Sequence, residues 1–176
     1  MNLPSVAFTI FALFSISCQP ALADCKLVAA GEDSETLMKA LETRLAPTGI
    51  EKIVSLPMPD NMRGLGFLTR DGLPASKLSV FITELNSVTN PEVLLVTGMT
   101  RTPDDNSDLE RQLIAAAFTL ARYSGKPEQT ILDHLTESTK SHATASSWKE
   151  EFENAAADFT RTDSALVFEA GKVKCD

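Results

Sequence analysis

The clearest pattern of apolar and polar positions runs from residue 93 to residue 121. It opens with four apolar residues in a row, Val93 to Val96, which is typical of a strand buried on both faces. After a short polar loop, Ser107 and Glu110 have the capping-box spacing that marks a helix start. Apolar residues then recur at helical spacing, which predicts an amphipathic helix packed on the strand: Leu109, Leu113, Ala116, Ala117 and Leu120.

Upstream of this unit the pattern predicts one helix and a set of strands. Residues 32–45 carry leucines at helical spacing, with Asp33 or Ser34 as the N-terminal cap. Apolar runs bounded by proline, glycine and Asp-Gly turn signals predict strands at residues 25–30, 50–56 and 64–69.

The segment 76–87 fits two patterns. Leucines together with Phe81 and Ile82 have helical spacing, whereas Leu78, Val80 and Ile82 alternate as they would in a strand. The β-branched and aromatic content of this run favours the strand. With the strand that begins at Val93, these segments would form a four-stranded antiparallel meander.

The C-terminal third predicts two more helices and a hairpin. One helix is expected at about residues 127–140, with Pro127 in its first turn. Another is expected from Ser147, which repeats the capping-box spacing with Glu150. Its apolar stripe would be Trp148, Phe152, Ala155, Ala156 and Phe159. Residues 165–169 and 172–175 are interpreted as a hairpin that turns across Ala170 and Gly171.

Together these elements predict an α+β fold in a single domain. The antiparallel sheet would consist of the meander plus the C-terminal hairpin, packed by about four helices. Helices and strands do not alternate along the chain, so a parallel sheet of βαβ units is not expected.

The first 23 residues have the pattern of a secretory signal peptide. They contain no charged side chain, and the apolar run from Val6 to Ile16 is followed by small residues at Ala21 and Ala23. Cleavage near Ala23 would leave residues 24–176 as one domain in the periplasm or outside the cell. A run of about 11 apolar residues is too short to span a bilayer, so we expect no transmembrane segment in the mature chain.

The cysteines fit an exported protein. Cys18 would leave with the signal peptide, so the mature chain would hold two cysteines, Cys25 and Cys175, at its ends. In an oxidising compartment this pair predicts a disulfide. A bridge closing so long a loop would contribute on the order of 5 kcal/mol on the chain-entropy model.

The net charge of the chain limits the kinds of molecule that we expect it to bind. The chain has 24 acidic and 16 basic residues, a net charge of -8. Such an acidic chain is a poor candidate for nucleic acid, which is bound through a basic field. We therefore expect the partner to be a protein or a small molecule.

No spacing of reactive residues predicts catalysis, a metal site or a cofactor. The two histidines, His134 and His142, lie eight positions apart and lack a metalloprotease pattern, so we interpret them as structural or surface residues. Asp104 to Asp108 begins like a calcium loop, but Leu109 stands where that loop needs glycine. Trp148 and Phe159 would suit a binding platform, yet their helical spacing favours the core.

Because no spacing of reactive residues predicts catalysis, we expect the protein to act by binding. The candidate surface is the loop of residues 100–106, between the central strand and the best-defined helix, with Arg101, Asp104 and Asp105 as ligand contacts. We expect an exported globular protein that binds a protein or small ligand. The alternatives are a hydrolase-like enzyme whose site combines distant residues, and a secreted effector acting on another cell.

Overall fold

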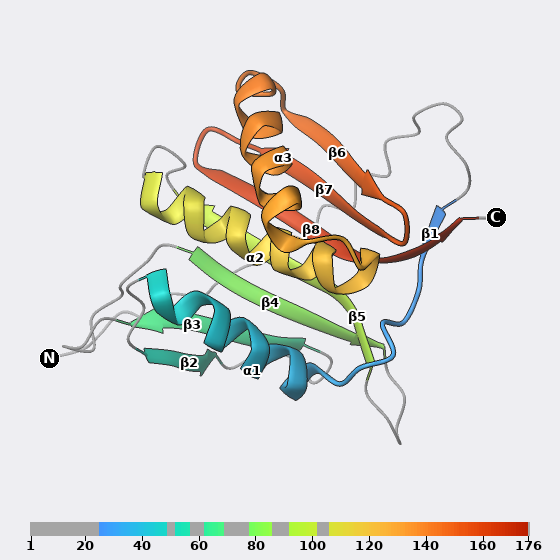
Figure 1. Ribbon diagram of the computed structural model, residues 1–176. Helices are drawn as coiled ribbons and strands as arrows, with labels where there is room; N and C mark the ends of the chain where they lie inside the picture. The colour runs from blue at the N-terminus through green and yellow to red at the C-terminus, as the bar shows by residue number, and fades with distance from the viewer. Residues whose placement is uncertain are drawn as a thin grey trace, which may run out of the picture.

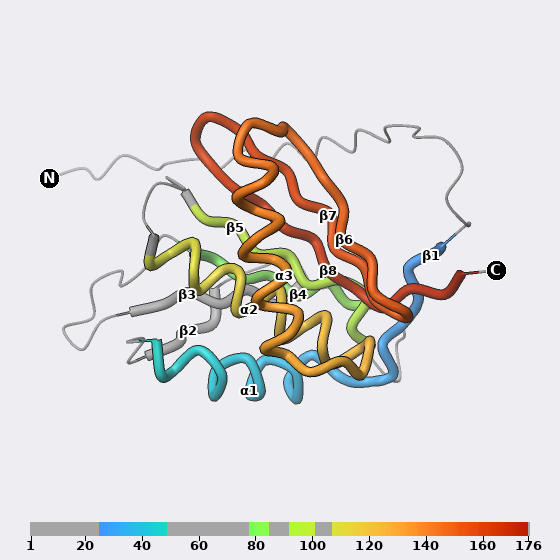
Figure 2. The backbone as a smooth tube through the Cα atoms, turned by 45° about the horizontal axis from the view of Figure 1, so that its top comes forward, coloured from blue at the N-terminus to red at the C-terminus, as the bar shows by residue number. Residues whose placement is uncertain are grey.

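In the computed structural model, the helices lie on one face of an antiparallel sheet (Figure 1). The structure describes residues 25–48, 52–56, 62–68, 78–85, 92–101 and 106–175. The sheet has eight strands in the order β2-β3-β4-β5-β8-β7-β6, and β1 pairs separately with β8. The tube view shows the helical layer from a second direction (Figure 2).

The first half of the chain has the predicted elements. They are β1 (Cys25–Leu27), α1 (Ser34–Leu45), a 3-10 turn (Ala46–Thr48), β2 (Lys52–Leu56), β3 (Met62–Leu68), β4 (Leu78–Leu85) and β5 (Glu92–Arg101). Strands β2 to β5 pair consecutively, which confirms the antiparallel meander. The segment that fitted both patterns is β4, so the strand assignment is confirmed.

The second half supplies most of the helical layer and the other side of the sheet. It consists of α2 (Asn106–Ser124), α3 (Glu128–Ser141), β6 (Ser147–Phe152), β7 (Ala155–Arg161) and β8 (Ala165–Cys175). The α+β arrangement is confirmed, but the described part of the chain has three α-helices instead of about four.

The helix predicted from Ser147 is wrong, because this segment is the hairpin β6–β7. Trp148 and Glu150 face the helices while Lys149 and Glu151 are exposed, which is the alternation of a strand. Glu150 is a charged residue on the buried face, so it concealed that alternation. The apolar residues on both strands happen to fall at helical spacing as well.

The predicted C-terminal hairpin is also wrong, because β8 runs unbroken through Ala170 and Gly171. Both residues pair with β7, opposite Ala157 and Ala156. Gly171 is needed for close approach and not for a turn. A Cβ there would lie 2.6 Å from Leu27 Cδ2.

Local signals explain how two helices begin. Asp33 caps α1 by accepting hydrogen bonds from the backbone N–H and the hydroxyl of Thr36, both at 2.8 Å. The hydrogen bonds lower the pKa of the Asp33 carboxyl. In the first turn of α2, Asp108 is buried and accepts a hydrogen bond from Arg111 at 3.0 Å. Asp108 is therefore part of the fold.

The prediction that this strand, β5, is buried on both faces is wrong. Val93 and Val96 are fully buried under the helices, while Leu94 and Leu95 are partly exposed. The register shifts opposite Thr83, and Leu94 is the extra residue in β5. This bulge places two valines three positions apart on one face.

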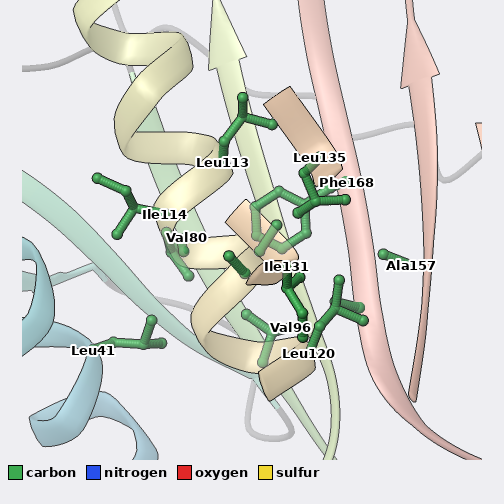
Figure 3. Packing of buried hydrophobic residues seen from close by; sticks show 14 of the residues in the cluster. Leu41, Val80, Val96, Leu113, Ile114, Leu120, Ile131, Leu135, Ala157 and Phe168 are labelled. Atoms are coloured by element: carbon green, nitrogen blue, oxygen red, sulfur yellow. The ribbon is translucent and has the colours of Figure 1, made fainter. Parts of the chain in front are cut away.

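The core fills the space between the sheet and the three helices (Figure 3). Phe168 of β8 lies over Gly98 of β5, where a Cβ would come within 2.0 Å of the phenyl ring. Above them, the Gln112 amide of α2 donates to the carbonyl oxygens of Gly98 and Leu166, at 3.2 and 2.9 Å. The central helix is thus attached to β5 and β8 by hydrogen bonds as well as by apolar packing.

The two ends of the described domain meet at a disulfide. Cys25 of β1 pairs directly with Cys175 of β8, and their sulfur atoms are bonded. The predicted bridge is confirmed, and it joins residues 150 positions apart.

Candidate functional site

The loop proposed from the sequence is only partly within the described residues. Arg101 is the last residue of β5 and pairs with Ala165, while Asp104 and Asp105 lie outside the described residues. The loop therefore stays a prediction. The structure points to a different place, where the last turns of α3 lie over the start of β6 and the end of β7.

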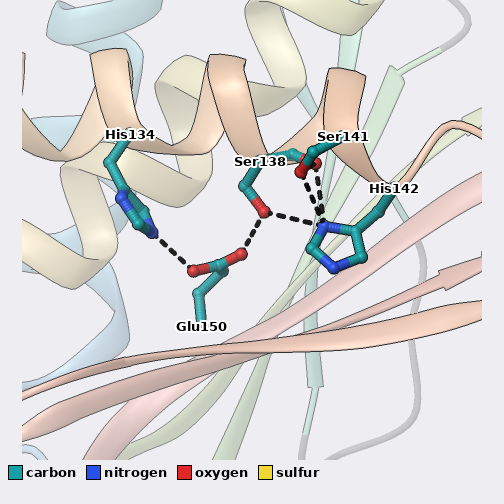
Figure 4. A network of polar contacts seen from close by, with 5 residues as sticks. All are labelled: His134, Ser138, Ser141, His142 and Glu150. Carbon is teal, nitrogen blue, oxygen red and sulfur yellow. Dashed lines mark hydrogen bonds and ion pairs between the residues drawn. The ribbon is translucent and has the colours of Figure 1, made fainter.

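A buried carboxylate anchors this part of α3 to the sheet (Figure 4). Glu150 of β6 is 8% exposed and faces the helix. Its Oε2 atom lies 2.6 Å from Nε2 of His134, and its Oε1 atom accepts a hydrogen bond from the Ser138 hydroxyl. A buried carboxylate is costly unless its oxygens are hydrogen-bonded. These two contacts explain why Glu150 is tolerated there.

The second histidine closes the same network without activating a serine. Nδ1 of His142 lies 2.9 Å from the Ser138 carbonyl oxygen, which assigns its proton to Nδ1. The Ser138 hydroxyl donates to Glu150 and not to a histidine. In a Ser-His-acid triad the histidine stands between serine and carboxylate and accepts the serine proton. The order here is different, so we read the network as structural.

A metal site is not formed by this network either. His134 and Glu150 are only two of the ligands that a protein metal site requires. Among the described residues, no three His, Cys, Asp or Glu side chains converge in a way that would hold a metal ion.

Beside the carboxylate, three aromatic rings stack. Trp148 and Phe159 are cross-strand neighbours, with ring centroids 4.9 Å apart and planes within 5°. The His142 ring stacks on Trp148 at 5.5 Å. Trp148 and Phe159 are buried, which confirms that they belong to the core, although they lie on strands and not on a helix. Their faces are used for packing, so the indole is not an open stacking platform.

Arg161, beside this aromatic stack, lacks the acidic partner that three other arginines of the described chain have. It is the last residue of β7, and its guanidinium carbon lies over the Trp148 ring, 5.8 Å from the ring centroid. It forms no ion pair with any carboxylate among the described residues, and its Nε atom is buried without a hydrogen-bond partner. Three other arginines, in contrast, each pair with an acid: Arg44 with Glu128, Arg111 with Asp108 and Arg122 with Glu32.

Two further polar groups are buried without partners, one on Trp148 beside Arg161 and one on the helix α3. They are the indole N–H of Trp148 and the hydroxyl of Thr139, which precedes His142 by about one turn of α3. Buried polar atoms are nearly always paired with protein or water. We call the set Thr139, His142, Trp148 and Arg161 the α3 corner.

Unpartnered polar atoms continue from the α3 corner toward β5. Arg161 pairs with Leu166 of β8, which pairs with Thr100 of β5. The Thr100 hydroxyl and the Oε1 atom of Gln112 are also buried without partners. The sheet thus brings polar groups from α2, α3, β5, β6 and β7 to one end of the molecule.

Sequence reasoning missed the α3 corner for a specific reason. Assigning residues from Ser147 onward to a helix separated Trp148 from its cross-strand neighbours. The available signal was the alternation of Ala157, Phe159 and Arg161, which places a cation in line with apolar core positions. That alternation is legible only once the segment is treated as a strand.

No protein-family model, curated protein or solved structure matches the chain. No helix within the described ranges is long and apolar enough to cross a membrane. The function must therefore be argued from the chemistry of the α3 corner.

Proposed function

We propose that this is an exported protein that acts by binding, with the α3 corner as its ligand site. The observation that carries the proposal is the set of polar groups without partners. Arg161, Trp148 and Thr139 each present a buried hydrogen-bonding atom that nothing in the described chain satisfies. Groups of this kind are costly in a protein that binds nothing, and they become favourable when a ligand completes their hydrogen bonds.

Export is supported by two independent features. The Cys25–Cys175 bridge fits an oxidising compartment, and the first 23 residues have the composition of a signal peptide. The periplasm and the extracellular space both meet these conditions. A secreted effector would use the same site from a different location.

The hydrolase alternative has less support. It needs a nucleophile with its base, but the Ser138 hydroxyl donates to Glu150 and His142 Nδ1 donates to a backbone carbonyl. Binding needs only the donors that are present.

Native mass spectrometry of the protein from its exported fraction, without reductant, tests this proposal. We expect a bound species on the wild-type protein that is absent from Arg161→Met. Lys126→Met is the matched control, because it also removes one cation but is exposed between α2 and α3. Before measurement, each variant is incubated with a small-molecule extract of the source cells.

The expected outcome is extra mass, and a higher unfolding temperature, in the wild type and in Lys126→Met only. Equal gains in Arg161→Met would contradict the α3 corner as the site. An absence of any bound species and any thermal shift in all three proteins would contradict a small-ligand binding role.

A further inference from the structure

We propose that the group bound at the α3 corner is a carboxylate, supplied by a small organic acid or by the C-terminus of a peptide. This inference rests on the proposed binding function and names the chemistry of the ligand. Four observations on the corner lead to it.

The unpartnered groups of the α3 corner can all donate. Trp148 offers an indole N–H, Arg161 offers its guanidinium N–H groups, and Thr139 offers a hydroxyl. Indole and guanidinium nitrogens cannot accept hydrogen bonds. A ligand group that satisfies them must therefore be an acceptor.

The ligand group should also be negative. The Arg161 guanidinium is charged at every physiological pH and has no carboxylate partner in the described part of the chain. The nearest acid on β6 is Glu150, two residues from Trp148, and its oxygens are engaged by His134 and Ser138. Acidic residues outnumber basic residues in this chain, yet Arg161 has none of them as a partner in the described part of the chain. We therefore expect an acidic group of another molecule to pair with it.

Shape favours a carboxylate over other anions and over rings. Guanidinium binds planar carboxylates through two parallel hydrogen bonds. The Trp148 ring is stacked with both Phe159 and His142, so neither face is open to a ligand, and its buried N–H is the one group of the ring that still lacks a partner. A sugar or an aromatic ligand would need a free ring face, and phosphate sites generally gather several donors with the cation at a loop or helix start.

The α3 corner lies at the rim of the sheet, where a ligand can enter. The Arg161 backbone N–H donates to the Ser146 carbonyl oxygen at 2.8 Å, so the chain enters β6 and leaves β7 side by side. Ser146 and Thr162, on either side, are exposed. Arg161 is partly exposed, so on this proposal a terminal carboxylate approaches its guanidinium from the rim while the rest of the ligand stays outside.

The sole tryptophan of the chain makes the test direct. Its indole N–H gives one cross-peak in a ¹H–¹⁵N spectrum of the full exported protein. The probes are sodium succinate, N-acetyl-trialanine, the C-terminal amide of that peptide and sodium phosphate, at matched pH and ionic strength. We expect succinate or the free-acid peptide to shift the peak in a saturable way, and the amide and phosphate to leave it unmoved.

Variants assign the effect to the corner. Arg161→Met should weaken carboxylate binding by roughly 10- to 100-fold, the range for a hydrogen bond to a charged group. Trp148→Phe keeps the stack and removes the N–H, and should weaken it by roughly 5- to 10-fold in calorimetry. Lys126→Met should bind as the wild type does, and all variants should keep their circular dichroism spectra.

The outcomes distinguish a peptide C-terminus from a small organic acid. They also distinguish failure of the carboxylate inference from failure of the binding proposal. Tighter binding of the free-acid peptide than of succinate indicates a peptide C-terminus, and the reverse indicates an organic acid. An equal shift by the amide or by phosphate overturns the carboxylate inference and leaves the binding site standing. If pure probes fail, the cell extract is compared before and after methyl esterification. A shift lost on esterification supports the carboxylate, and one retained overturns it. No shift by any sample means that water fills the corner, and both proposals fail.

Discussion

Two arginines near opposite ends of the fold have opposite surroundings. Arg122, in the last turn of α2, lies toward the disulfide end, and its guanidinium contacts both carboxylate oxygens of Glu32 at 2.6 to 2.8 Å. Arg161, at the end of β7, has no acidic partner in the described chain. The first arginine connects two parts of the chain. The second is the arginine of the proposed ligand site.

The difference separates a stabilising region from the region that we propose as the ligand site. At the disulfide end, the bridge, the Glu32–Arg122 pair and backbone bonds between Val93 and the segment before α1 hold the N-terminal strand in place. At the α3 corner, buried donors lack partners. Charges that are paired internally contribute to stability, whereas buried polar groups without partners call for an explanation, and at Arg161 the proposed site supplies one.

The largest effect is expected from Cys175→Ser. Opening a loop of this length should lower the free energy of unfolding by on the order of 4 to 5 kcal/mol. Urea denaturation of the variant and of the wild type, with and without reductant, measures it. Reductant should destabilise only the wild type. Equal stability of the oxidised wild type and the variant would show that the bridge is not part of the stabilising region.

Glu150→Ala should have the next largest effect. It leaves the buried Ser138 hydroxyl without its acceptor, so we expect a loss of about 2 kcal/mol in unfolding free energy. Glu151→Ala is the matched control, because Glu151 is adjacent on β6, exposed and paired only with Lys149. Its loss should stay below about 0.5 kcal/mol. Similar losses from both variants would remove Glu150 from the structural network.

The two arginines provide the sharpest test of the comparison. Arg122→Met should lower the free energy of unfolding by about 1 kcal/mol, since it breaks a partly buried ion pair. Arg161→Met should change it by less than about 0.5 kcal/mol, because no ion pair is lost and a buried unpaired N–H is removed. Chemical denaturation compares them directly. If Arg161→Met costs as much as Arg122→Met, the cation over Trp148 is structural and the contrast fails.

The smallest effect concerns Asp158 and Glu169, which face each other across β7 and β8. Burial raises the pKa of both carboxyl groups, and neighbouring Asp158 raises that of Glu169 further. The folded state then binds protons more tightly than the unfolded state, so this contribution to stability falls as pH rises from about 4 through the raised pKa values.

Asp158→Asn should therefore raise the free energy of unfolding at pH 7 by about 0.5 kcal/mol and have little effect near pH 3. The increment is small because both side chains, although partly buried, are exposed enough for solvent to screen their interaction. Asp163→Asn, in the turn before β8, is the control. An increment that is constant with pH would argue against titration of this pair.

The sequence predicted best where one pattern had no competitor, or where β-branched content decided between two. Leucines on α1 and β-branched runs in the meander agreed with turn signals, and both assignments hold. The helix from Ser147 failed because Glu150 is charged yet buried, and because two strands joined by a short turn mimic helical periodicity. Gly171 was taken for a turn because sequence cannot show that Leu27 packs against it.

The candidate site was less predictable than the fold. Arg161 and Thr139 are ordinary residues in sequence, and their interest comes from missing partners, which is a three-dimensional property. Arg101 was chosen for its location in a loop, without a contact that would distinguish it. The approach of Trp148 on β6 to Arg161 on β7 depends on strand pairing, and the local pattern does not specify that pairing.

The bond between Cys25 and Cys175 makes the domain a covalent ring, because their Cα atoms are 4.0 Å apart at neighbouring ends of the fold. One proteolytic cut anywhere between them leaves a single molecule, whose pieces separate only after reduction. The same adjacency allows circular permutation, with the ends joined near the bridge and new termini opened at the β6–β7 turn. A protein exposed to proteases gains resistance to fragmentation from this topology without a larger core.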